Sequence, residues 1–163
     1  MIRSKIFTGI FLSAAVLALP SCNSGKSGDQ AEEEAGLTAS ATLDASQETQ
    51  EVTSDGTGTL AGTYDEATGE LTFQLEWSAL SGAPSMMHFH GPASPGTDAG
   101  VKIPITDFPT EASGSVSQTV SVPEGDRADL LAGKWYVNIH TEAYGAGEIR
   151  GQVTVENSGE TGN

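Results

Sequence analysis

Cysteine, basic residues and histidine are all scarce in this chain of 163 residues. A single cysteine, Cys22, excludes an intramolecular disulfide, so a folded domain must be stabilised by its hydrophobic core alone. Lysine and arginine number 7 against 22 aspartates and glutamates, which gives a formal net charge of −15. A polypeptide this acidic repels nucleic acid and anionic headgroups, and neither is expected as a direct partner.

Motifs of the common enzyme classes are also missing from the sequence. No G-x-S-x-G nucleophile turn occurs, and neither a phosphate-binding loop nor a dinucleotide fingerprint is present. The sequence therefore favours a non-enzymatic binding or structural protein over a catalyst.

The first 21 residues have the pattern of a secretory signal. A basic start precedes an apolar run over residues 6–19, and at about 14 residues this run falls short of the roughly 20 that span a bilayer. Cys22 follows a Leu-Pro-Ser stretch that resembles the lipobox of bacterial lipoproteins, in which the cysteine receives a diacylglycerol group. We therefore expect cleavage after residue 21 and a membrane anchor on Cys22, with acyl chains such as palmitate.

Composition divides the rest of the chain into three parts. Residues 22–36 are polar and then acidic, with almost nothing to bury, and are expected to form a flexible tether. Residues 37–156 carry the apolar pattern of one folded domain, and residues 157–163 are expected to be a disordered tail. The expected location is the cell envelope, with the domain held at the outer membrane on its periplasmic face or at the cell surface.

Apolar and polar residues alternate through most of the 37–156 segment, which is typical of half-buried strands. The clearest alternation runs from Glu70 to Ser78, with Leu71, Phe73, Leu75 and Trp77 on one face. Residues 48–54 are expected to form a weak strand or a loop, and residues 123–132 a short helix stopped by Gly133. About eight short strands separated by turns predict an all-β fold, an antiparallel Greek-key-like sandwich or barrel.

The three histidines of the chain are placed so that they can share a site. His88 and His90 lie on one expected strand, two residues apart, so both side chains point to the same face about 7 Å apart at Cα. His140 lies on another expected strand, on the face opposite Val137 and Ile139. If the apolar residues face the core, all three imidazoles point away from it. An H-x-H pair with a third histidine can hold one copper or zinc ion.

Two interpretations of the histidines stay open at this stage, because H-x-H also occurs by accident in surface or capping positions. Six residues nearby are candidate supporting groups or partner contacts: Met86, Tyr136, Glu148 and Arg150, with Glu142 and Tyr144 as weaker candidates. Met86 shares the histidine face and offers a soft sulfur. For Glu148 and Arg150 the plainer expectation is a surface ion pair that contributes under about 1 kcal/mol.

Several segments together resemble the CHRD domain, named for chordin, an extracellular binder of bone morphogenetic proteins, and widespread in bacterial secreted proteins. They are HFHGPA at 88–93, Gly96 with Gly100-Val101, LAGKWYVNIHT at 131–141 and GEIRGQV at 147–153. The resemblance covers roughly residues 37–155 and implies an all-β sandwich with a distant similarity to copper/zinc superoxide dismutase. The histidines of the family pattern fall on His88, His90 and His140.

This sequence departs from the dismutase in ways that limit what the resemblance implies. Three histidines are too few for the two metals of that enzyme, and one cysteine cannot form its disulfide. Growth-factor binding does not carry over either, because chordin also uses cysteine-rich domains that this chain lacks.

Two functions therefore follow from the sequence. The first is a membrane-anchored lipoprotein of the cell envelope that acts as a non-enzymatic binding or structural module, with an unidentified protein or glycan partner. The second is an envelope protein that holds copper or zinc on the three histidines, with dismutase-like redox chemistry as its furthest extension. The metal content of the protein separates them.

Overall fold

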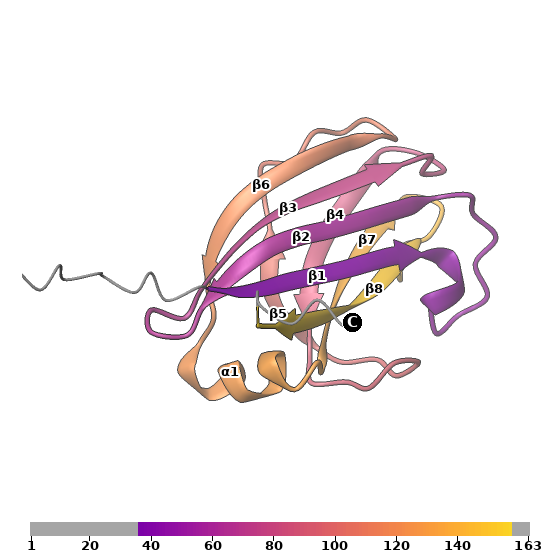
Figure 1. Cartoon of the computed structure of the whole chain (residues 1–163). Coiled ribbons are helices and arrows are strands. Elements are labelled where there is room, and N and C mark those ends of the chain that lie inside the picture. Colours follow the sequence, from indigo (N-terminus) through magenta and orange to yellow (C-terminus); the bar gives the residue numbers. More distant parts are fainter. Residues whose placement is uncertain (1–35, 158–163) are drawn as a thin grey trace, which may run out of the picture. The chain divides into compact units, whose positions relative to one another are not determined.

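Residues 36–157 of the computed structural model describe one antiparallel β domain (Figure 1). The expected signal peptide, Cys22 and the tether up to residue 35 lie outside the described residues, as does the tail from residue 158. The described part contains one α-helix, α1 (Glu124–Leu131), one 3-10 turn, η1 (Ala45–Gln47), and the strands β1 (Leu37–Asp44), β2 (Thr57–Asp65), β3 (Glu70–Ser78), β4 (Pro84–His90), β5 (Val101–Ile105), β6 (Gly114–Ser121), β7 (Trp135–Thr141) and β8 (Ile149–Glu156). The all-β prediction of about eight strands with one short helix is confirmed.

The strands form a single sheet in the order β5-β4-β7-β8-β1-β2-β3-β6, and every neighbouring pair is antiparallel. The sheet curls into a nearly closed barrel whose edge strands are β5 and β6, and the connections from β3 to β4 and from β5 to β6 give it Greek-key-like crossings. Within the described residues no backbone ladder joins the two edges. The side-chain amide of Gln118 donates instead to the carbonyl of Thr106, just past the end of β5.

Every second residue of the strands points into the barrel and forms its core. On β3 the four residues predicted to point inward, Leu71, Phe73, Leu75 and Trp77, are all at most 3% exposed. The rings of Phe73 and Phe89 meet edge to face with centroids 5.1 Å apart. Burying an apolar side chain of this size contributes about 1.5–3 kcal/mol, so this one core can stabilise the domain without a disulfide.

Loops cover the outer face of the sheet where β4, β7 and β8 lie side by side. All seven residues of β7 are buried, although only alternate ones face the core. The cover comes from the loops of residues 45–56, 91–100 and 142–148, whose atoms bond to the outward side chains of these strands. The sequence predicted correctly which residues face away from the core, but this face does not lie open to solvent.

The segment of residues 48–54, expected to be a weak strand or a loop, is a loop that follows η1. The turn itself begins at Asp44, whose carboxylate accepts a hydrogen bond from the backbone N–H of Ser46 at 2.8 Å. This cap satisfies a donor that the short turn would leave free. It directs the chain over the outer face of β8 and β7.

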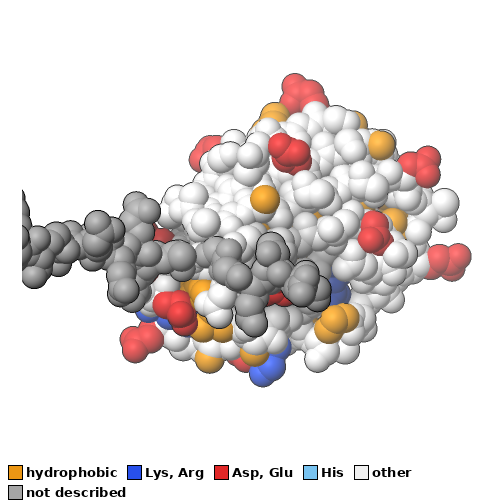
Figure 2. All heavy atoms as spheres, viewed as in Figure 1, with side chains coloured by type: hydrophobic (Ala, Val, Ile, Leu, Met, Phe, Trp, Pro, Cys, Tyr) orange, Lys and Arg blue, Asp and Glu red, His pale blue; other side chains and the backbone are white. Residues whose placement is uncertain are grey.

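The expected helix over residues 123–132 is confirmed as α1, which buries Leu130 and is followed by Gly133 with φ +68°. No helix within residues 36–157 has the length and the apolar character needed to cross a bilayer. Acidic side chains are scattered over the face shown in Figure 2 and do not gather into one patch there.

Candidate metal centre

The three histidines lie on neighbouring strands and converge on one point of the covered face. β4 and β7 are antiparallel partners, with His88 opposite Asn138 and Met86 opposite His140. One ring nitrogen from each of His88, His90 and His140 lies within 4.8 Å of the other two. The closest pair is Nδ1 of His88 and Nε2 of His140, which are 3.3 Å apart. Within the described residues, no cysteine, aspartate or glutamate joins this group.

His90 is held by the β4–β5 loop in a single tautomer. Its Nδ1 lies 3.0 Å from the carbonyl oxygen of Ala99, and because a carbonyl can only accept, Nδ1 must carry the proton. Nε2 is then unprotonated and carries a lone pair, and this atom is buried without any hydrogen-bond partner. Leaving such an atom unpaired costs about 1–3 kcal/mol, a cost that coordination of a cation would offset.

His140 is held in the same way by the β7–β8 loop. Its Nδ1 lies 3.1 Å from the carbonyl oxygen of Gly145 and donates to it, so its Nε2 is also a lone pair and faces His88. Metal-bound histidines commonly have this arrangement, with one ring nitrogen fixed by a carbonyl and the other free to coordinate. Two loops thus set the two imidazoles in the form that a metal requires.

Burial keeps all three imidazoles neutral. It is the main cause that lowers the pKa of His88, His90 and His140, and the pKa of His140 falls from 6.5 to about 4. The other two histidines lower the pKa of His140 further, while its hydrogen bond to Gly145 acts against them. At neutral pH each ring is therefore in the uncharged state that binds metal.

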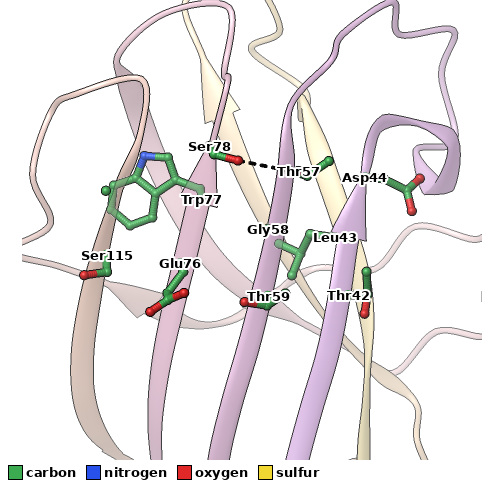
Figure 3. A pocket seen from close by; sticks show the side chains of 11 residues that line it. Thr42, Leu43, Asp44, Thr57, Gly58, Thr59, Glu76, Trp77, Ser78 and Ser115 are labelled. Carbon is green, nitrogen blue, oxygen red and sulfur yellow. Dashed lines mark hydrogen bonds between the residues drawn. The ribbon is translucent and has the colours of Figure 1, made fainter.

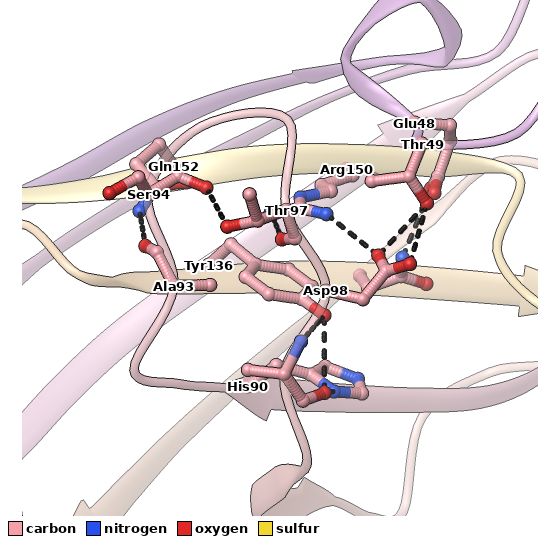
Figure 4. A network of polar contacts seen from close by, with 12 residues as sticks. Glu48, Thr49, His90, Ala93, Ser94, Thr97, Asp98, Tyr136, Arg150 and Gln152 are labelled. Atoms are coloured by element: carbon pink, nitrogen blue, oxygen red, sulfur yellow. Dashed lines mark hydrogen bonds and ion pairs between the residues drawn. The ribbon is translucent and has the colours of Figure 1, made fainter.

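Tyr136 lies between His90 and Arg150 on the covered face (Figure 4). Its ring stacks on the imidazole of His90 with centroids 4.8 Å apart and planes 3° from parallel. The guanidinium carbon of Arg150 lies 3.4 Å from the centre of the same ring, at cation–π distance. The hydroxyl of Tyr136 accepts a hydrogen bond from the backbone N–H of Ala99 and lies within donating distance of the Ala99 carbonyl, so the residue that fixes His90 is itself fixed.

Arg150 and Glu148 do not form the surface ion pair that their spacing suggested. Arg150 is 2% exposed, and it donates to the carboxylate of Asp98 at 3.2 Å and to the carbonyl of Thr97 at 2.6 Å. Glu148 is fully buried and accepts instead from the side chains of Ser54, Ser81 and Thr141 and from the backbone N–H of Ser81. Periodicity placed both residues on the outer face, but it could not show that loops enclose them.

The hydrogen bonds to Glu148 keep this buried carboxylate ionised. Desolvation raises the pKa of Glu148, but the bonds from Ser54, Ser81 and Thr141 outweigh it, and the pKa lies below its usual value. The carboxylate ties the β1–β2 and β3–β4 loops to the end of β7. Glu148 thus holds the loops that cover the site in place, and it does not belong to the histidine cluster.

A second acid, Glu48, lies in the network and had no sequence signal. It accepts from Nδ2 of Asn138 at 3.0 Å. Burial raises its pKa to about 7, Asp98 adds to this, and Arg150 and Asn138 oppose it. Gly147 makes room for this contact, because a Cβ there would lie 2.5 Å from Nδ2 of Asn138.

Of the remaining residues predicted to lie near the histidines, two have a place at the site or in its covering loops and one does not. Met86 is 45% exposed and lies on the histidine face. Tyr144 donates its hydroxyl to the carbonyl of Thr53 at 2.6 Å and so joins two of the cover loops. Glu142 is exposed, and no role in the cluster follows for it. The groups that sequence reasoning missed are Glu48, Asp98 and the carbonyls of Ala99 and Gly145, all contributed by loops.

A separate groove of about 640 Å³ lies on the outer face of β1, β2, β3 and β6 (Figure 3). Its lining is rich in hydroxyl groups and contains two carboxylates. One of these, Asp44, is already used by Ser46 and Gln47. The groove contains no histidine and is distinct from the metal-binding candidate.

Fold and site together define a small all-β domain, a single sheet curled into a nearly closed barrel, in which a covered face holds three neutral imidazoles. The family model of the CHRD domain matches residues 39–153. The chain therefore belongs to the CHRD domain family, and the match covers nearly all of the described barrel. No match was found among curated proteins or among solved structures.

Proposed function

We propose that this protein is a lipid-anchored CHRD module of the cell envelope that binds one copper or zinc ion through His88, His90 and His140. It acts by binding, and no catalytic turnover is part of the proposal. An envelope protein or glycan as partner stays a prediction from the sequence.

The observation that carries the proposal is the convergence of three neutral ring nitrogens within 4.8 Å. Two of them are lone pairs whose opposite ring nitrogens donate to backbone carbonyls, those of Ala99 and Gly145. A set of surface histidines would not be fixed in this way, nor would it bury an unpartnered Nε2 as His90 does. The arrangement supports a preformed ligand set.

The chemistry of the donors favours copper or zinc. Imidazole nitrogens suit these ions, whereas calcium and magnesium prefer oxygen ligands. With three protein ligands, an ion keeps a coordination position for a further group. Bound at this place, the ion would supply a Lewis-acidic or, for copper, a redox-active centre on the covered face.

Metal analysis tests the proposal directly. Protein purified without a polyhistidine tag and reconstituted with copper or zinc should retain about one equivalent after dialysis. The His88/His90/His140→Ala variant should retain almost none, while Glu142→Ala, an exposed change on the adjacent loop, should bind as the wild type does. Retention below about a tenth of an equivalent by the wild type would contradict the proposal.

Thermal unfolding provides a second readout. A ligand that binds the native state alone stabilises it, so the ion should raise the melting temperature of the wild type and of Glu142→Ala but not that of the triple variant. Far-UV circular dichroism of the variants without metal checks that each is folded.

The anchored location is part of the proposal and is supported by the sequence alone. Cys22 follows an apolar segment at the position where lipoproteins are acylated, and residues 22–36 provide a polar spacer before the domain. Anchoring would hold the metal-binding face within reach of the envelope.

A further inference from the structure

Met86 is one of two large apolar side chains exposed in the described part of the chain, 45% exposed; the other is Val101 on β5. A single exposed apolar side chain is ordinary on a protein surface. Met86 is of interest because its thioether, a soft metal ligand, lies on the strand face that carries the histidines.

The register of β4 and β7 places Met86 next to two of the three histidines. It lies directly opposite His140 in the antiparallel pair, where Cβ atoms are about 4.5–5.5 Å apart. It precedes His88 by two residues and so shares its face, since Met87 between them and Phe89 after His88 both point into the core, with 1% and 0% exposure. With three rotatable bonds, a methionine side chain is long enough to bring its sulfur from this position to an ion held by the histidines.

We propose that Met86 supplies its thioether sulfur as a fourth ligand and makes the site selective for Cu(I). This inference rests on the proposed function and specifies the metal. Three neutral nitrogens and one neutral sulfur add no negative charge to the ion, and within residues 36–157 no carboxylate belongs to the ligand group. Soft thioether sulfur prefers Cu(I), whereas zinc gains little from it.

The exposure of Met86 gives the ligand a second property. The rings of His90 and His140 are fixed by loops, whereas Met86 is exposed, and a thioether ligand there can leave the ion. A ligand set with two histidines fixed by loops and one exposed thioether suits a protein that receives and releases Cu(I) rather than one that holds it permanently.

The adjacent methionines provide a matched pair for the test. Met86→Leu removes the sulfur at the site, and Met87→Leu makes the same change in the core one residue away, where Leu fits a Met-sized space. The protein, purified in detergent without a polyhistidine tag, is loaded anaerobically with Cu(I) or separately with Zn(II). Affinities are measured by competition with a chromophoric chelator for each metal.

We expect Met86→Leu to weaken Cu(I) binding by about tenfold or more, while Zn(II) binding changes by less than about twofold. Met87→Leu should leave both affinities close to those of the wild type. X-ray absorption at the copper edge should detect a sulfur neighbour in the wild type and in Met87→Leu, and only light scatterers in Met86→Leu.

Three outcomes would overturn the inference. An unchanged Cu(I) affinity in Met86→Leu, equal losses for both metals, or a wild-type absorption spectrum without sulfur would each exclude the thioether ligand while leaving the three-histidine site intact. Failure of the wild type to bind either metal would overturn the proposed function itself, so the two failures are distinguishable.

Discussion

Single residues of the covered face differ in how burial affects their protonation. The histidines are kept neutral, since burial lowers their pKa values. Glu148 is kept ionised by its hydrogen bonds, and Glu48, with fewer donors, has its pKa raised to about 7. Burial therefore dominates the pKa of the histidines and of Glu48, whereas for Glu148 the hydrogen bonds outweigh it.

The pKa of His140 predicts a pH-dependent stability. Its value is about 4 in the folded protein and 6.5 without burial, so between these limits the unfolded chain binds a proton that the folded domain excludes. Stability from this residue is complete above pH 6.5 and falls as the pH drops towards 4. The full effect is on the order of 3 kcal/mol.

Comparison with His140→Gln isolates this effect in urea unfolding of chelator-treated protein. Glu48 acts in the opposite sense, because its raised pKa makes stability fall as the pH rises through 4.5 to about 7, but it is present in both proteins. From pH 7 to pH 4 the wild type should lose on the order of 3 kcal/mol more than the variant. Parallel losses would show that His140 titrates normally in the folded state.

At the scale of elements, the site depends on loops as much as on strands. β4 and β7 bring the imidazoles together, but the loops of residues 91–100 and 142–148 fix their tautomers through Ala99 and Gly145. The β7–β8 loop must pass close to β7, and Gly147 allows this with φ +140° and no Cβ. The loop geometry is therefore a requirement of the ligand set.

Gly147→Ala should disturb this loop. The added Cβ would lie 2.5 Å from Nδ2 of Asn138 and 2.7 Å from Oε1 of Glu48, at a positive φ, so we expect a loss of about 2–4 kcal/mol in unfolding free energy and weaker metal binding. Gly145→Ala in the same loop meets no atom within 4 Å and should change either quantity little. Equal effects of the two substitutions would contradict this role for Gly147.

The strands could be predicted from the sequence, but the loops that cover the outer face of β4, β7 and β8 could not. Alternation over Leu71 to Trp77 fixed the core face of β3, and the same period placed His88, His90 and His140 on one side of the sheet. The alternation of apolar and polar residues along a strand shows only on which face of the sheet a side chain lies. Whether a loop folds over that face depends on contacts such as Arg150 with Asp98, 52 positions apart, for which no local pattern exists.

At the scale of the whole molecule, the net charge bears on how the proposed membrane attachment would work. The net charge is −15, and acidic side chains are spread over the face in Figure 2. Such a domain is repelled by anionic surfaces. The membrane attachment that we propose would therefore depend on the lipid expected at Cys22 and not on the polypeptide surface.

Cys22→Ser should release the protein from the membrane. A serine has no thiol for acylation, so the variant is expected in the soluble or secreted fraction, whereas the wild type partitions into detergent. Fractionation with immunodetection and mass spectrometry of the mature N-terminus measure this. Ser21→Ala, which keeps a small residue before the cysteine, serves as the control. Membrane retention of Cys22→Ser equal to that of the wild type would contradict the anchor.

The barrel is not closed by a backbone ladder between its edge strands β5 and β6. Local unfolding is therefore expected to begin at an edge strand. β5 has five residues and one ladder, to β4, so backbone amides should exchange with solvent there sooner than in β7 and β8. Loss of β5 would leave β4, which carries His88 and His90, as the edge strand, held by its ladder to β7, which carries His140. An ion bound by the three histidines would join β4 to β7 and so hold the strand that becomes the edge once β5 separates.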